Sequence, residues 1–203
     1  MNVQDLLEAL AGPSATPGGG SAAALAGAMG AALLSMACNL TIGRKRFAAV
    51  EDELRGVLQE AEHWRQALTG LADADARSFQ EVMAGYRLPQ ETQEEQAARR
   101  TAIQAALRHA TQVPLETAAG CAALVKLIGQ VIAKINPNVM SDAGAGALLA
   151  MAGLKAAQLN VAVNLSAIED LAFVQETQRN LNGFLAGVDQ VQARILTYVL
   201  EHV

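Results

Sequence analysis

The segment that decides the fold lies between Pro17 and Phe47 and reads PGGGSAAALAGAMGAALLSMACNLTIGRKRF. Glycine costs roughly 1 kcal/mol at each helical position and proline costs more, so Gly18–Gly20 is predicted to be a loop. Ser21 is predicted to cap the next helix, because its hydroxyl can accept a hydrogen bond from a free backbone N–H one turn on. The residues from there to Ile42 are mostly small, which lets other backbones approach this helix closely.

The composition favours helices along the whole chain. Of its 203 residues 52% are hydrophobic and only 3% are aromatic, alanine is abundant, and runs of β-branched residues are scarce. The length is sufficient for one sizeable core. No stretch alternates with a period of two, and no linker or repeat divides the chain. We therefore predict an all-α fold in which residues 1–203 form one domain, an antiparallel helical bundle of six to seven helices, two of them long.

Hydrophobic periodicity and helix breakers place the expected helices. Thr92 and Glu95 form a predicted capping box, from which a helix runs onward. Val113-Pro114 marks either a kink in that helix or the start of a new one. Ser141 or Asp142 is expected to cap a later helix. The other expected helices cover residues 3–10, 21–42, 48–86, 115–135 and 167–202.

The charge and the cysteines exclude several classes of function. A net charge of −5 argues against a nucleic-acid-binding protein. Cys38 and Cys121 have no partner at metal-ligand spacing, so two buried free thiols in a reducing compartment are expected. The three histidines are scattered, and no metal site is predicted.

Ala22–Ile42 resembles a membrane span in length, since it carries no charge and cations follow it. It consists mainly of alanine and glycine, however, and contains Ser35 and Asn39. The first ten residues carry Asp5 and Glu8 in place of a basic leader. We therefore expect a cytoplasmic protein that does not span a membrane, with a small membrane-associated helical protein as the alternative.

Asp75 is the first candidate for a catalytic residue. It lies four residues after Leu71 and four before Phe79, on the apolar stripe of the helix 48–86, whereas Asp73 points nearly opposite, towards solvent. Burial raises the pKa of a carboxyl group towards values useful for proton transfer near neutral pH. The alternatives are an aspartate bonded to a neighbouring helix end and a position that is not buried.

The helix that ends near residue 165 carries a second unusual stripe. Asp142 and Asn160 lie about 27 Å apart along it, so one compact pocket cannot use both. Asn160 and Asn164 are one turn apart and can share a pocket. The alternative has Asp142 as an N-cap and the two amides bonding across helices. The stripe consists of Asp142, Gly146, Gly153, Ala157, Asn160 and Asn164.

Arg44, Lys45 and Arg46 follow the small-residue helix directly. Such a cluster is either a solvated helix end, where cations complement the helix dipole, or a site for a carboxylate-bearing ligand.

The segment 17–47 resembles the opening of the cyclodeaminase/cyclohydrolase family, whose domain is fused to formiminotransferase in animal bifunctional enzymes and occurs alone in bacteria. The similarity continues through nearly the whole chain, in order. It includes DADARSFQEVM (73–83), RLP (87–89), VPL (113–115), NPNVMSD (136–142) and NVAVNL (160–165). One departure is TIGRKRF, where relatives often have TIGKKKY, so that Phe47 replaces a tyrosine hydroxyl.

The resemblance implies a helical bundle that forms a homodimer and acts on a one-carbon-substituted tetrahydrofolate, without a metal or a further cofactor. Two reactions are known in the family: closure of 5-formiminotetrahydrofolate to the 5,10-methenyl form with loss of ammonia, and interconversion of 5,10-methenyl- and 10-formyltetrahydrofolate with water. A chain without an attached formiminotransferase favours the cyclohydrolase reaction. The alternative is a non-catalytic folate-binding or scaffold protein.

The resemblance also implies roles for particular residues. The aspartate of the DADA segment that is tied to catalysis in the family corresponds to Asp75. The substrate-binding candidates are Gly18, Gly19, Gly20, Ser21, Asn39, Arg44, Lys45, Arg46, Asp142, Asn160 and Asn164.

Overall fold

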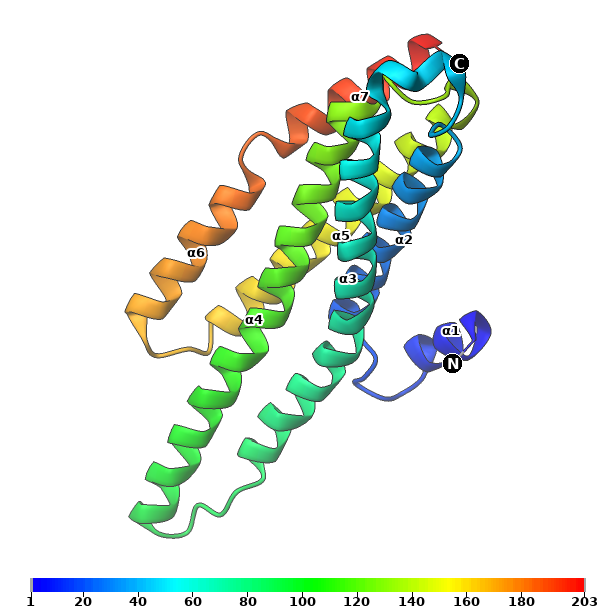
Figure 1. Ribbon diagram of the computed structural model, residues 1–203. Coiled ribbons are helices and arrows are strands. Elements are labelled where there is room, and N and C mark those ends of the chain that lie inside the picture. The colour runs from blue at the N-terminus through cyan, green and yellow to red at the C-terminus, as the bar shows by residue number, and fades with distance from the viewer. Residues whose placement is uncertain (1, 203) are drawn as a thin grey trace.

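The computed structural model describes residues 2–202, which form helices, turns and loops and contain no strand (Figure 1). The all-α prediction is confirmed. The α-helices are α1 (Val3–Ala11), α2 (Gly19–Asn39), α3 (Glu51–Tyr86), α4 (Gln93–Val131), α5 (Met140–Leu165), α6 (Leu171–Leu185) and α7 (Val188–His202). Two short 3-10 helices, η1 (Lys45–Val50) and η2 (Pro137–Val139), precede α3 and α5.

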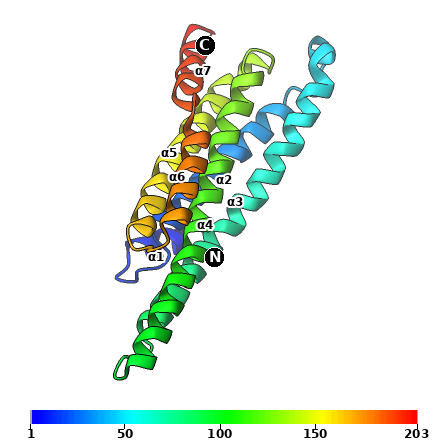
Figure 2. The ribbon, with the colours of Figure 1, turned by 90° about the vertical axis from the view of Figure 1, so that its left-hand side faces the viewer.

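The helices α2, α3, α4 and α5 form an antiparallel four-helix bundle, and α6 and α7 run back along α4 and α5 (Figures 1 and 2). The bundle helices differ in length: α3 has 36 residues and α4 has 39, whereas α2 has 21. The α3–α4 hairpin therefore projects beyond the ends of α2 and α5. The helix α1 buries none of its side chains and stands at the edge of the bundle.

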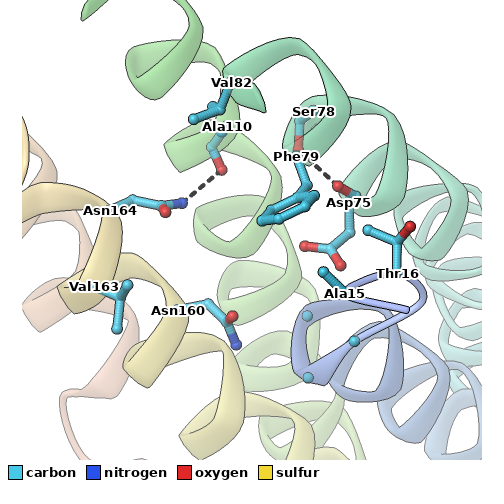
Figure 3. Close-up of a pocket in the computed structure, with 13 residues that line it drawn as sticks. Ala15, Thr16, Asp75, Ser78, Phe79, Val82, Ala110, Asn160, Val163 and Asn164 are labelled. Atoms are coloured by element: carbon cyan, nitrogen blue, oxygen red, sulfur yellow. Dashed lines mark hydrogen bonds between the residues drawn. The ribbon is translucent and has the colours of Figure 1, made fainter. Parts of the chain in front are cut away.

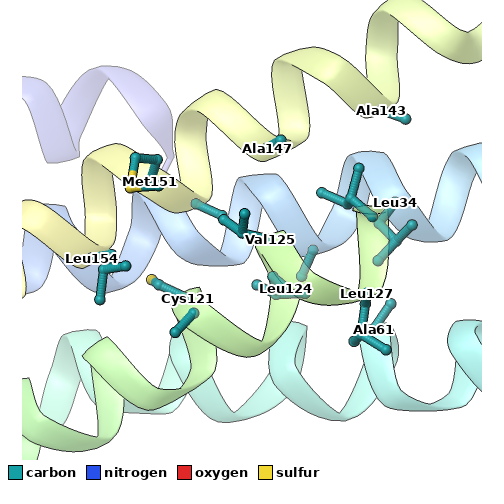
Figure 4. Close-up of a cluster of buried hydrophobic side chains, with 14 of the residues drawn as sticks. Leu34, Ala61, Cys121, Leu124, Val125, Leu127, Ala143, Ala147, Met151 and Leu154 are labelled. Carbon is teal, nitrogen blue, oxygen red and sulfur yellow. The ribbon is translucent and has the colours of Figure 1, made fainter. Parts of the chain in front are cut away.

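The core is aliphatic and is centred where all four bundle helices meet (Figure 4). Leu34, Leu54, Leu124 and Leu154 are fully buried in it, together with many alanines. A second, smaller cluster holds the base of the projecting hairpin, around Val82, Ile103 and Leu107. With 3% aromatic residues, packing of alanine and branched aliphatic side chains supplies nearly all of the core.

The helices α2 and α5 approach each other until their backbones touch. A Cβ atom added at Gly30 would lie 2.7 Å from the Gly146 carbonyl oxygen, and one added at Gly153 would lie 2.7 Å from the Ala23 carbonyl oxygen. Both distances are far below van der Waals contact. Glycine is therefore required at these crossing points, as the small-residue composition of 21–42 predicted.

Several predicted helix boundaries were wrong. The helix α2 begins at Gly19 with Gly18 as its N-cap, so Gly19 and Gly20 are helical and do not belong to the predicted loop. Ser21 therefore lies inside the helix and does not cap it. Neither Ser141 nor Asp142 caps α5, because that helix begins at Met140 and the Asn136 side chain stabilises the turn before it by accepting from the Asn138 N–H. The helix was also predicted to reach Ile42, but it ends at Asn39, and a turn follows in which Gly43 has a φ of +79°.

The helix α4 runs through Pro114 without interruption, so the interpretation of a new helix start was wrong. Its capping box at Thr92 and Glu95 is confirmed. The predicted helix 167–202 is also wrong, because it divides into α6 and α7 at Gly187, which has a φ of +74°. The second long helix of the bundle is therefore α4 and not the C-terminal segment.

Both cysteines are buried and unpaired, as predicted. Burial raises the pKa of the Cys38 thiol from 9.0 to about 11 and that of the Cys121 thiol to about 12. Both thiols therefore stay protonated and unreactive near neutral pH.

By length and composition, two helical segments are apolar enough to cross a membrane, Gly19–Asn39 and Pro137–Leu165. The bundle buries 61% of the apolar window of the first and 44% of that of the second, so much of this hydrophobicity belongs to the core. The expectation that the chain does not span a membrane stays a prediction.

Gly30→Ala is expected to lower the free energy of unfolding by about 1–3 kcal/mol, because the added methyl group meets a carbonyl oxygen of the α5 backbone. Denaturant unfolding of the purified protein measures this loss. The matched control is Gly70→Ala on α3, where a Cβ atom has no neighbour within 4 Å and where alanine should stabilise the helix by up to about 1 kcal/mol. Equal stabilisation by both substitutions would contradict the close contact.

Candidate active site

A pocket lies where α2 begins and α5 nears its end, against the projecting α3–α4 hairpin (Figure 3). Its volume is about 290 Å³, at the lower end of the range for small-molecule sites. Its lining comprises Ala15, Thr16, Gly18, Gly19, Gly20, Asp75, Ser78, Phe79, Val82, Ala110, Asn160, Val163 and Asn164. The catalytic candidate and both candidate asparagines are thus brought together.

The Asp75 carboxylate lies directly against the first turn of α2. A Cβ atom added at Gly20 would lie 2.1 Å from Asp75 Oδ1 and 2.5 Å from its carboxyl carbon. The carboxylate occupies the space that any other residue at position 20 would fill. Asp75 is half-buried and Asp73 is exposed, so the stripe predicted the orientation of both but overstated the burial of Asp75.

The buried Ser21 side chain holds Asp75 from the other side. Its hydroxyl oxygen lies 2.9 Å from the Ala72 carbonyl oxygen and 3.0 Å from Asp75 Oδ2. A hydroxyl has one proton and two lone pairs, so it can donate to one of these oxygens while it accepts from a protonated carboxyl group. Ser21 is therefore engaged within the protein and only 2% exposed, which leaves Asp75 Oδ1 as the carboxylate oxygen towards the pocket.

Beyond Asp75, the stripe of α3 lines the pocket, and only part of it is buried. Ser78, Phe79 and Val82 follow Asp75 at spacings of three, four and seven. Phe79 was predicted as part of the buried stripe, but it is 40% exposed. The reason is that α2 begins beside Asp75, so it does not extend along the part of α3 that carries Phe79.

The two asparagines extend from α5 towards the same pocket (Figure 3). Asn160 Nδ2 donates to the Ala156 carbonyl oxygen at 2.9 Å, within its own helix. Asn164 Nδ2 donates across to the Ala110 carbonyl oxygen of α4 at 3.0 Å. The amide bonding across helices that the sequence left open is therefore present for Asn164.

Five of the predicted site residues lie at the opposite end of α2. The 21 residues of α2 span about 30 Å, and the exposed Arg44, Lys45 and Arg46 follow its C-terminal end, near Asn39. The start of α5 lies there too, since the Asn136 N–H donates to Thr41 Oγ1 at 2.9 Å, so Asp142 is also remote from the pocket. Within one chain these residues do not belong to the Asp75 site.

No cationic side chain is among the residues that line the pocket, and its hydrogen-bond donors include backbone N–H groups at the start of α2. The first intrahelical hydrogen bond of α2 runs from the Ala22 N–H to the Gly18 carbonyl. The N–H groups of Gly19, Gly20 and Ser21 precede it and have no partner within the helix. A carbonyl oxygen or an anion is therefore accommodated at this end of α2. Within residues 2–202, no three His, Cys, Asp or Glu side chains are placed to hold a metal ion.

Comparisons with known proteins agree with this architecture. A family model for formiminotransferase-cyclodeaminase matches residues 2–183. A methenyltetrahydrofolate cyclohydrolase from Methylorubrum extorquens is 47% identical over 193 residues, which is 95% of this chain and 93% of that protein. The chain belongs to the formiminotransferase-cyclodeaminase family. All lining residues of the pocket, from Ala15 to Asn164, fall within the part that matches the family.

Two further proteins of this family are less similar to the chain, one because it is much longer and both because their sequence identity is lower. The formimidoyltransferase-cyclodeaminase of Rattus norvegicus is 34% identical over 90% of this chain, but the chain spans only 34% of the rat protein. The crystal structure of formiminotetrahydrofolate cyclodeaminase from Thermotoga maritima has a TM-score of 0.89 at 26% identity, with 99% of this chain and 96% of that chain covered. The predicted family is confirmed.

Sequence reasoning missed part of the lining. Ser78 and Val82 share the helical face of Asp75, and that spacing alone could have identified them. Ala15 and Thr16 precede the three glycines, and no sequence pattern marks them as site residues. Ala110 enters the site through its backbone carbonyl, which side-chain patterns cannot reveal.

Gly20→Ala is expected to move the Asp75 carboxylate by about 1 Å or more and to break its hydrogen bond with Ser21, because the new methyl group needs that space. The fold should persist, since the displaced atoms are the end of a flexible side chain and alanine favours the helix. A crystal structure and a thermal unfolding curve of the variant measure both effects.

Gly19→Ala is the control, because a Cβ atom there would lie 3.9 Å from its nearest neighbour, Asn160 Nδ2. An unmoved Asp75 in the Gly20→Ala variant would contradict the proposed contact.

Proposed function

We propose that this protein is an enzyme of folate one-carbon metabolism that acts on the one-carbon bridge between N5 and N10 of tetrahydrofolate. The observation that carries the proposal is the Asp75 carboxylate, which presents Oδ1 to a pocket built from the segments that match the family. Of the two family reactions, we propose methenyltetrahydrofolate cyclohydrolase as the main activity. The support is that a protein of that name aligns over 93% of its length at 47% identity.

In the hydrolytic direction, Asp75 acts as a general base. It accepts a proton from a water molecule as the water oxygen bonds to the methenyl carbon. The bond from that carbon to N5 then breaks, N5 receives a proton from Asp75, and the carbon stays on N10 as a formyl group. The hydroxyl group that the water leaves on this carbon loses its own proton to solvent as the C=O bond forms. Of the two protons of the water, Asp75 therefore carries one to N5, and the other is released.

The same group also serves cyclodeamination, which we propose as a second activity. The formimino group reacts in its protonated form, with two hydrogens on its nitrogen. N10 bonds to the formimino carbon and gives its proton to Asp75, and the carboxyl group returns that proton to the departing NH2 group, which leaves as ammonia. No lysine or histidine among the lining residues could take this proton in place of Asp75.

Ser21 fits this cycle as a positioning residue. When Asp75 is ionised, the Ser21 hydroxyl can donate to Oδ2 at 3.0 Å. When Asp75 is protonated, the hydroxyl can turn to the Ala72 carbonyl at 2.9 Å and accept from the carboxyl group. The carboxyl group therefore keeps a hydrogen-bond partner in both of its protonation states.

We also propose that the protein is a cytoplasmic homodimer that pairs through the outer face of α2 and α5. Apolar side chains stand exposed on this face, among them Met29, Leu148, Leu159 and Val163, and the described part of the chain does not cover them. Val163 also lines the pocket, so the face is continuous with the site. The two unpaired thiols support a reducing compartment.

A two-fold axis near Met29, at the middle of α2, would run the two copies of α2 antiparallel. The end of one copy that carries Arg44, Lys45 and Arg46 would then lie beside the Gly18–Gly20 turn of the other. In that arrangement the cations reach the carboxylates of a folate tail, which they cannot do within one chain.

Asp75→Asn should lower the turnover of 5,10-methenyltetrahydrofolate by about 10²- to 10⁴-fold with the fold intact, because the amide cannot carry the proton. Loss of the methenyl absorbance measures turnover, and its gain from 5-formiminotetrahydrofolate measures the second activity. Asp73→Asn is the matched control, since that side chain is exposed two residues away.

Absence of turnover of either substrate by the unmodified protein would overturn the enzymatic proposal and favour a non-catalytic folate-binding or scaffold protein. Full activity of Asp75→Asn would remove Asp75 from the mechanism.

Met29→Glu is expected to convert the homodimer to a monomer, because it places a charge at the centre of the proposed interface, where Met29 is 52% exposed. Light scattering should show a mass near 21.2 kDa for the variant and twice that for the unmodified protein. Leu200→Glu, on α7 and 76% exposed, is the control and should stay dimeric. A single-chain mass for the unmodified protein would refute the dimer.

A further inference from the structure

Pro114 leaves one carbonyl group of α4 without its helical partner. In an α-helix the carbonyl of residue 110 accepts from the N–H of residue 114, and proline has no N–H. Asn164 Nδ2, from α5, donates to this Ala110 carbonyl at 3.0 Å instead. A buried carbonyl without a partner is costly, so the Asn164 amide stabilises the carbonyl group that Pro114 leaves unpaired.

This contact fixes which way the Asn164 amide faces. Only its NH₂ group can donate to a carbonyl oxygen, because the opposite orientation would bring two acceptor oxygens together. Asn164 Oδ1 must therefore turn away from Ala110, as Figure 3 shows. The same argument applies to Asn160, whose Nδ2 is held by the Ala156 carbonyl at 2.9 Å.

Asn160, Asn164 and Asp75 line one pocket, and the Oδ1 atom of each accepts no hydrogen bond from residues 2–202. No lysine, arginine or histidine is among the lining residues. The three free acceptor oxygens favour a ligand edge that carries several N–H donors.

The reduced pterin ring of tetrahydrofolate has that character. It carries N–H donors at the 2-amino group, N3 and N8, and one carbonyl oxygen at C4. The carbonyl matches the free N–H groups at the start of α2, on the other wall of the pocket.

We propose that Asn160 and Asn164 are specificity residues that accept hydrogen bonds from the N–H groups of the pterin ring, and that Pro114 is the positioning residue that fixes Asn164 in its acceptor orientation. This inference rests on the proposed function, which names tetrahydrofolate as the substrate. Beyond that function, it states which ligand groups the two asparagines bind. It also gives a role to Pro114, which does not itself line the pocket.

The decisive variant is Pro114→Ala. It gives residue 114 an N–H, so the Ala110 carbonyl regains a helical partner and Asn164 is free to rotate. KM should rise about tenfold while kcat changes less than about twofold, because one oriented hydrogen bond is lost and Asp75 is untouched. The unfolding temperature should stay the same or rise, since proline is unfavourable inside a helix.

A double-mutant cycle with Asn164→Ala shows whether Pro114 acts through Asn164. Asn164→Ala alone should raise KM by at least as much, and Pro114→Ala should add less than twofold in that background. An unchanged KM in Pro114→Ala would overturn the positioning role. So would a double variant in which the KM increases of the two single variants multiply.

Calorimetric titration with tetrahydrofolate separates this inference from the proposed reaction, because it needs no turnover. The unmodified protein should bind an analogue without the 2-amino group about tenfold more weakly than tetrahydrofolate, and the Asn160→Ala/Asn164→Ala variant should no longer distinguish the two. If the unmodified protein binds tetrahydrofolate with this preference but turns over neither substrate, the proposed reaction is wrong and the specificity role of the asparagines stands. If the unmodified protein and the double variant discriminate equally between the two ligands, the specificity role is wrong and the proposed reaction is unaffected.

Discussion

The contact between the backbones of α2 and α5 determines where the other parts of the site lie. Gly30 meets Gly146, and Gly153 meets the Ala23 carbonyl, at distances that exclude any side chain. Two helices that touch in this way cannot slide or rotate without a collision, because the contact is between backbones and not between adaptable side chains. The first turn of α2 and the asparagines of α5 are therefore fixed relative to each other, and Asp75 packs against that turn at Gly20.

Within this frame, Asp75, Asn160 and Asn164 each have one polar atom bound by the protein and one that accepts no hydrogen bond from the described part of the chain. Ser21 engages Oδ2 of Asp75 and leaves Oδ1, while backbone carbonyls engage the NH₂ groups of Asn160 and Asn164 and leave their oxygens. The polarity of the pocket is thus set before a ligand arrives, which lowers the entropy lost on binding. In the proposed reaction, a carboxylate that takes and returns a proton benefits from such fixed surroundings, since its partners do not have to reorganise.

The sequence predicted the helical fold and the face of α3 on which Asp75 lies because both depend on local periodicity. A residue four positions from Leu71 and four from Phe79 must share their face of α3, whatever packs against it. Ser21 was misassigned as a cap because the hydroxyl of a serine near a helix start serves equally for a local or a distant partner, and here the distant Ala72 and Asp75 prevail. The arginines near position 44 follow the glycine loop closely in sequence but lie a helix length away, and only the direction of α2 reveals this. The link between Pro114 and Asn164 was beyond prediction, because it depends on which helices are neighbours.

The unequal lengths of the helices explain why a pocket exists at this place. The long α3 and α4 continue past the start of α2, so α2 does not cover the hairpin beyond Asp75. Val82 is buried there in the smaller cluster, but Phe79 stays exposed, and the pocket opens between Asp75 and the asparagines. The opening adjoins Val163, which is 69% exposed and belongs to the apolar outer face of α5. In the proposed dimer, a second copy on that face would supply the missing wall, so the proposed interface and the enclosure of the pocket would follow from the same difference in helix length.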